Sequence, residues 1–221
     1  MASTGQMNNY KQGYSSQTVA TQQTRTAESE AAFLLPYIKK TDYILDVGCG
    51  PGTITLGFVK YASEGKTVGI DISANVLGRA KTAANEARIP KEEPGSIGFE
   101  EGNILEGLAY PDNTFDVVFC AHTFGYMPPP DMPLKALTEM RRLLKPGGIL
   151  ATRDTIEQHF YPRSMDLDRL WVGNFRRAVL KGDPEADLSP PVMPALFRRA
   201  GFDADGARRP LTPELAGGWH H

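Results

Sequence analysis

A glycine cluster between an apolar run and a helical pattern constrains this chain more than any other feature. Residues 43–47 read YILDV, a short apolar run typical of a buried strand, and three glycines follow within positions 48–52. Glycine lets the backbone turn sharply and approach a ligand closely. The helix expected from about Thr53 offers free N–H groups and a partial positive charge at its N-terminus. Strand, glycine turn and helix together predict a ligand-binding turn.

The chain as a whole alternates apolar runs of strand length with amphipathic runs of helix length. Such alternation predicts a mostly parallel sheet with helices on both faces, a Rossmann-like α/β fold. The strands that are fully apolar agree with this fold, because parallel strands are buried on both sides. Expected strands cover 43–47, 67–71, 97–103, 115–122 and 149–154, and expected helices cover 26–40, 53–62, 72–88, 133–144, 166–180 and 192–202.

The two ends of the chain differ from this core. Residues 1–24 are polar, so we expect 1–25 to form a flexible segment or a lid over a site. We expect 26–221 to form a single domain, with a core over 26–155 and a cap or C-terminal part over 156–221. After Gly201 the chain is polar and rich in proline, which is poorly tolerated in a central strand. We therefore expect the C-terminal part of the sheet to be incomplete.

Composition excludes several classes of function. Lysine and arginine number 24 and aspartate and glutamate 26, and the net charge of −2 gives no general attraction to nucleic acids or anionic membranes. Two cysteines, Cys49 and Cys120, are too few for a disulfide framework and show no metal-ligand spacing. The N-terminus lacks the apolar core of a secretory signal, and no run reaches the ~18 apolar residues of a membrane helix. We expect a cytoplasmic protein without a metal.

Three polar residues at or near the ends of successive strands suggest what the turn binds. Asp46 precedes the glycines, whose spacing is G-x-G-x-G and not the G-x-G-x-x-G of dinucleotide sites. A carboxylate beside a helix N-terminus suits an amino-acid group that carries both an ammonium and a carboxylate. Asp71, 25 residues later, is placed to accept the hydroxyls of a ribose. Asn103, after the third strand, can read the edge of an adenine with its amide.

These segments, in this order, resemble the successive motifs of class I S-adenosylmethionine-dependent methyltransferases. The motifs are DVGCGPG, GIDIS, EGNI, FDVVFCAH and LKPGG, and the resemblance covers about residues 25–155. The branch it resembles most is related to the C-methyltransferases of ubiquinone and menaquinone synthesis. One such glycine motif is weak evidence, whereas five motifs at the right spacing are strong.

The resemblance implies a cofactor, S-adenosyl-L-methionine, with S-adenosyl-L-homocysteine as product, and a role for each matching position. The family more often has Asp where this chain has Asn103, and either side chain can accept from the adenine amino group. The implied contacts are Gly48, Cys49, Gly50 and Gly52 under the methionine moiety, Asp46 on its ammonium, Asp71 on the ribose, Ile72 against the adenine, Asn103 and Ile104 at the other adenine edge, Ala121 and His122 beside the methionine, and Arg25 and Thr26 lining the same pocket.

The catalytic assignment is less determined. His122 ends the fourth strand, at the sheet edge where ligands bind, so it is our candidate general base, although a packing histidine is equally compatible with the sequence. We expect methyl transfer to a small molecule at an unresolved C, O, N or S atom. Two alternatives stay open: a non-catalytic S-adenosylmethionine-binding module, and a nucleotide-dependent oxidoreductase. The glycine spacing and the lack of a Tyr-x-x-x-Lys pair weigh against the oxidoreductase.

Overall fold

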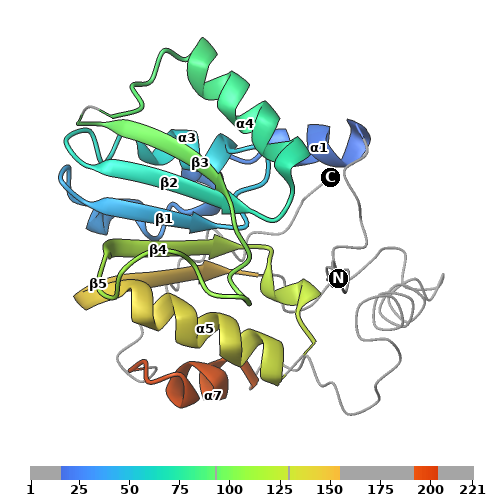
Figure 1. Ribbon diagram of the computed structural model, residues 1–221, viewed down its shortest axis with the longest axis vertical. Helices are drawn as coiled ribbons and strands as arrows, with labels where there is room; N and C mark the ends of the chain where they lie inside the picture. Colours follow the sequence, from blue (N-terminus) through green and yellow to red (C-terminus); the bar gives the residue numbers. More distant parts are fainter. Residues whose placement is uncertain (1–15, 93, 129, 155–191, 204–221) are drawn as a thin grey trace, which may run out of the picture.

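A five-stranded parallel sheet forms the centre of this computed structural model, which describes residues 16–92, 94–128, 130–154 and 192–203 (Figure 1). The strand order is β3-β2-β1-β4-β5, and all four neighbouring pairs are parallel. The order reverses between β1 and β4, which is where open α/β sheets bind ligands. The strands are β1 (Tyr43–Val47), β2 (Lys66–Asp71), β3 (Ser96–Glu101), β4 (Phe115–Ala121) and β5 (Leu144–Arg153).

Helices cover both faces of the sheet, which confirms the predicted Rossmann-like fold (Figure 1). One face packs against helices α5 (Asp131–Leu143) and α7 (Val192–Arg199), with Leu45 and Val47 of β1 in the same buried cluster. The other face packs against α2 (Ala27–Glu30) and α3 (Thr53–Phe58), while α4 (Ala74–Glu86) covers β3. Side chains alternate along a strand, so Asp46 lies on the α3 side, between the two core residues Leu45 and Val47.

The predicted helix over 26–40 is wrong in length. Thr26 does cap a helix, because its side chain accepts from Ser29 N and Ser29 accepts from Thr26 N in a reciprocal capping box. That helix, α2, ends at Glu30, and a short 3-10 helix, η1 (Leu35–Tyr37), follows. Pro36 has no N–H to donate to an α-helical ladder and fits the first turn of a new element instead.

Two further stretches were not foreseen in detail. Residues 16–23, within the segment 1–25 expected to be flexible or a lid, form helix α1 (Ser16–Gln23), with Val19 buried, and that expectation stays a prediction. Strand β5 starts at Leu144, earlier than expected, with an irregularity where the pairing jumps from Leu144 to Ile149. The predicted helix over 166–180 and the segment after 203, where we expect no further strand, lie outside the described residues. The part described is therefore the sheet and its helices up to the end of β5, plus α7.

Candidate cofactor site

The glycine loop after β1 is held against the end of β2 by backbone hydrogen bonds. Both Gly48 N and Cys49 N donate to Ile70 O at 2.9 Å. Gly48, Gly50 and Gly52 all have φ between 55° and 79°, a left-handed backbone that residues with a Cβ rarely adopt. The loop thus depends on glycine for its course.

Two of these glycines serve different ends. A Cβ on Gly50 would meet only Gln22 Oε1, at 3.7 Å, so this glycine leaves its face open toward the pocket. A Cβ on Gly52 would lie 2.7 Å from Phe99 and 2.8 Å from Ala80, so Gly52 lets the start of α3 pack against β3 and α4. The lack of a side chain at Gly50 therefore leaves room for a ligand, whereas at Gly52 it allows the helices and strand to pack.

Asp71 joins the loop to the next helix through both carboxylate oxygens. Its Oδ2 accepts from Gly50 N at 3.0 Å and its Oδ1 accepts from Ser73 N at 2.9 Å. Ser73 in turn caps α4. The neighbouring Ile72 is 36% exposed, which is unusual for a large apolar side chain in this molecule. A buried carboxylate beside an exposed isoleucine presents a polar and an apolar surface to one ligand.

Asp46 lies beneath the loop and is almost fully buried. Its Oδ2 accepts a 2.6 Å hydrogen bond from the Thr55 hydroxyl on α3. Burial, reinforced by the nearby Asp71 charge, raises the pKa of Asp46 to about 7, although the Thr55 bond acts in the opposite direction. Because burial disfavours the ionised form of Asp46, an ammonium group in the pocket would stabilise that form.

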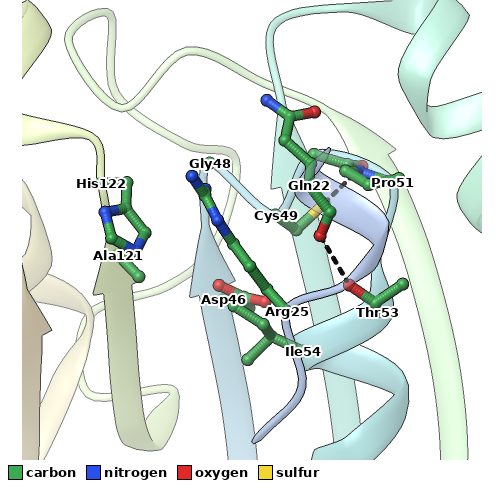
Figure 2. Close-up of a pocket in the computed structure, with 11 residues that line it drawn as sticks. Gln22, Arg25, Asp46, Gly48, Cys49, Pro51, Thr53, Ile54, Ala121 and His122 are labelled. Carbon is green, nitrogen blue, oxygen red and sulfur yellow. Dashed lines mark hydrogen bonds between the residues drawn. The ribbon is translucent and has the colours of Figure 1, made fainter. Parts of the chain in front are cut away.

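A small pocket opens above Asp46 and the loop (Figure 2). In Figure 2, Ala121 and His122 at the end of β4 lie on one side, Pro51 and Thr53 on the other, and Arg25 between them. The pocket is lined by Gln22, Arg25, Asp46, Gly48, Cys49, Gly50, Pro51, Thr53, Ile54, Ala121 and His122. The structure thus brings seven of the predicted site residues together: Arg25, Asp46, Gly48, Cys49, Gly50, Ala121 and His122.

Other predicted residues lie outside the pocket lining. The side-chain amide of Asn103 forms hydrogen bonds within its own turn: its oxygen accepts from Leu105 N at 3.0 Å and its nitrogen donates to Glu106 Oε1 at 2.9 Å. Ile104 is 5% exposed and packs in the core cluster of β1 and α5. Thr26 caps α2. The adenine-edge role of Asn103 and Ile104 and the pocket role of Thr26 stay predictions, and each side chain has a structural task as well.

Four lining residues were missed by the sequence reasoning: Gln22, Pro51, Thr53 and Ile54. The last three adjoin the glycine motif, so their positions in the turn and first turn of α3 could have been included. Gln22 comes from α1, where the sequence carries no motif.

Cys49 is buried and burial raises the pKa of its thiol, so it is protonated at neutral pH.

His122 is held in an unusual conformation by charged neighbours. Its φ is 54°, in the left-handed region, and its backbone N–H donates to the backbone carbonyl oxygen of Arg153 at 2.7 Å. Its Nε2 lies 2.9 Å from Glu30 Oε2. Burial lowers the pKa of His122, with Arg25 and Arg153 acting in the same direction and Glu30 in the opposite one. The imidazole is therefore neutral at pH 7.

Within the described ranges, no three His, Cys, Asp or Glu side chains gather as a metal site would require. The described helices include none with both the length and the apolar character to cross a bilayer.

The sheet order, the glycine turn at its switch point, Asp46 within β1 and Asp71 at the end of β2 are typical of an α/β protein of the methyltransferase class. The cradle at Gly50 and the carboxylates of Asp46 and Asp71 fit S-adenosylmethionine, whose amino-acid part carries an ammonium and whose sugar carries two hydroxyls.

Comparison with known proteins gives the family. A methyltransferase domain family matches residues 44–148. A probable methyltransferase of Aspergillus luteorubrus, ltbC, is 91% identical over 209 residues, which cover 94% of this chain and 73% of that protein. The chain therefore belongs to the class I S-adenosylmethionine-dependent methyltransferases, as predicted, and S-adenosylmethionine is its cofactor.

Two more distant comparisons place the branch and the fold. A demethylmenaquinone methyltransferase of Symbiobacterium thermophilum is 37% identical over 115 residues, and the match covers 51% of this chain but only 42% of that protein. The predicted likeness to the quinone-synthesis branch is thus confirmed over the core. The crystal structure of a methyltransferase from Aquifex aeolicus has a TM-score of 0.61 at 22% identity, covering 86% of this chain and 89% of its own, and shows the shared fold.

Proposed function

We propose that this protein transfers a methyl group from S-adenosylmethionine to a small, partly apolar acceptor. The proposal rests on the glycine turn at the sheet's switch point. There the Asp71 carboxylate accepts from Gly50 N, and Asp46 and Arg25 line the adjacent pocket. S-adenosylmethionine supplies a methyl group already activated by its sulfonium, so the chain's work is to align the reactants and exclude water.

Each residue has a proposed role. Asp46 balances the ammonium, the Arg25 guanidinium faces the carboxylate of the methionine part, and Asp71 accepts from the ribose while Ile72 lies against the adenine. Because Gly50 has no side chain, the ligand can approach the backbone of the loop closely at this position. His122, neutral and at the pocket wall, takes the proton when the acceptor must lose one.

We propose that residues 1–25 cover the bound reactants. Helix α1 already supplies Gln22 to the pocket wall, and Arg25 follows it directly. Limited proteolysis with and without S-adenosylhomocysteine tests this cover. We expect slower cleavage within 1–25 when the ligand is present, and unchanged cleavage would refute the cover.

The acceptor and the compartment are also proposals. A net charge of −2 favours a small molecule over a nucleic acid, and we place the protein in the cytoplasm. The relative from Symbiobacterium thermophilum acts, by its name, on demethylmenaquinone, which suits a partly apolar acceptor here.

The test has two steps. Thermal shift with S-adenosylmethionine, S-adenosylhomocysteine and NADPH should show stabilisation by the first two alone; stabilisation by NADPH would favour an oxidoreductase. A panel of small hydroxyl, thiol, amine and activated-carbon acceptors with methyl-labelled donor should then show transfer. Binding without any transfer across the panel would favour a non-catalytic binding module.

A further inference from the structure

Glu30 and Arg153 form a charged trio with His122, which lines the pocket. Glu30 Oε2 lies 2.9 Å from His122 Nε2 and 3.2 Å from Arg153 Nε. The side chains of Glu30 and His122 are 13% and 24% exposed, so water competes little for this contact. Three elements meet here, because Glu30 ends α2, His122 follows β4 and Arg153 ends β5.

The geometry decides which imidazole nitrogen carries the proton. Arg153 Nε forms an ion pair with Glu30 Oε2 at 3.2 Å, and an ionised carboxylate has only accepting oxygens. An accepting oxygen at 2.9 Å requires a donor on the His122 side, and a neutral imidazole has one donor nitrogen and one acceptor nitrogen. Nε2 must then carry the hydrogen, which leaves the lone pair on Nδ1.

The backbone of His122 is held in place as well. His122 keeps a left-handed φ of 54°, which costs a residue with a Cβ on the order of 1–3 kcal/mol. The adjacent hydrogen bond from His122 N to Arg153 O, at 2.7 Å, fixes that conformation. Arg153 is itself anchored, because its Nη1 donates to Ser29 O at 2.6 Å. The sheet and α2 thus fix His122 at both its backbone and its ring.

We propose that Glu30 is a positioning residue that holds His122 in the Nε2–H tautomer, so that Nδ1 is the proton acceptor for the methyl acceptor. This inference rests on the proposed function. For a hydroxyl acceptor, its proton passes to Nδ1, an oxygen lone pair forms the bond to the methyl carbon, and the carbon–sulfur electron pair stays on sulfur. The imidazolium that results faces the Glu30 carboxylate, and its proton later leaves to water.

The charged groups that face His122 set its titration. Burial is the largest influence and lowers the pKa of His122; Arg25, after α1, and Arg153, on β5, act in the same direction, whereas Glu30, on α2, raises it. Asp46 of β1 lines the same pocket. Replacing Glu30 by Gln removes the one charge that favours the imidazolium, so the pKa of His122 should fall further.

Nitrogen-15 NMR of histidine-labelled protein tests the tautomer directly. In the full chain with S-adenosylhomocysteine bound at pH 7.5, we expect the His122 Nε2 shift of a protonated nitrogen and the Nδ1 shift of an unprotonated one. Glu30→Ala should give a mixture of tautomers, and Glu30→Gln should lower the pH at which His122 titrates. A protonated Nδ1 in the wild type, or a titration unmoved by Glu30→Gln, would overturn the proposal.

Turnover separates positioning from simple support of the fold. With a hydroxyl acceptor from the panel, Glu30→Gln should lower kcat about tenfold or more and shift the acid limb of the pH profile, while a thiol acceptor should lose little. Glu28→Gln is the matched control, because Glu28 lies on the same helix and pairs with Lys60 at 3.2 Å on the surface. Equal loss with both acceptors would overturn the proposal. Failure of the wild type to bind S-adenosylhomocysteine would instead refute the proposed function.

Discussion

The Asp71 carboxylate accepts the Gly50 N–H at 3.0 Å, which joins the end of β2 to the glycine loop of β1. The same carboxylate accepts from Ser73 N at the start of α4. One side chain therefore organises two turns at the edge where the strand order reverses. We propose that the same carboxylate also accepts from the ribose hydroxyls of the cofactor.

Asp71→Asn should weaken binding of S-adenosylhomocysteine by about tenfold to a hundredfold, since hydrogen bonds to a charged group contribute about 1.5–3 kcal/mol. Isothermal titration calorimetry measures the change. Asp112→Asn serves as the control, because Asp112 is an exposed partner of Arg142. Equal affinity in wild type and Asp71→Asn would remove Asp71 from the ribose site.

Two alanine substitutions in the glycine loop should differ in effect, one mainly lowering cofactor affinity and the other mainly lowering stability. Gly50→Ala adds a methyl group toward the pocket, so we expect lost affinity with a modest loss of stability from its φ of 55°. Gly52→Ala presses on Phe99 and Ala80, so we expect unfolding to become easier by about 1–3 kcal/mol. Chemical denaturation and calorimetry separate the two effects. Similar stability losses in both variants would contradict the division of roles.

Asp46→Asn should make the fold more stable at high pH and less able to bind cofactor. Burial raises the pKa of Asp46 from its ordinary 3.8 to about 7, so between these values the native state binds more protons than the unfolded chain. Stability from this group is present at low pH and is lost as pH rises toward 7. Asparagine avoids the buried charge and can still accept from Thr55.

The difference in melting temperature between Asp46→Asn and wild type should therefore grow from pH 5 to about pH 7 and level off above it. Other titrating groups are the same in both proteins and cancel. A difference that is constant with pH would show that the Asp46 pKa is not raised. Retained affinity for S-adenosylhomocysteine would remove Asp46 from the ammonium site.

Thr26→Ala should cost about 1 kcal/mol of stability through loss of the α2 cap. If the cap is the whole role of Thr26, affinity for the cofactor should stay unchanged. Thermal unfolding and calorimetry on the same sample decide the matter. A large loss of affinity with little loss of stability would instead support the predicted place of Thr26 in the pocket.

Much of the fold followed from local pattern. The five strands and the turn over 48–52 are visible in sequence because buried parallel strands are apolar and the turn requires glycine at fixed places. The end of α2 was missed because the apolar spacing continues through Leu34 and Leu35, while Pro36 breaks the helix ladder. Periodicity reports a buried face and does not report the type of helix.

The site was predictable where a motif lies in one segment and not where it is assembled from several. Asp46 and Gly50 belong to one turn, so the sequence indicates them together. The contacts of Glu30 with His122 and Arg153 join positions far apart in the chain, and no local pattern predicts them. Asn103 shows the reverse case, because the motif indicates a ligand contact while its amide bonds within its own turn.

The most direct measurement is isothermal titration calorimetry of the folded full chain with S-adenosylhomocysteine, beside Asp71→Asn and Gly50→Ala. We expect saturable heat at one site per chain for the wild type, and affinity reduced tenfold or more in both variants. No heat from folded wild-type protein, or equal affinity in all three, would contradict the claim that the glycine turn and the carboxylate at the end of β2 together bind this cofactor.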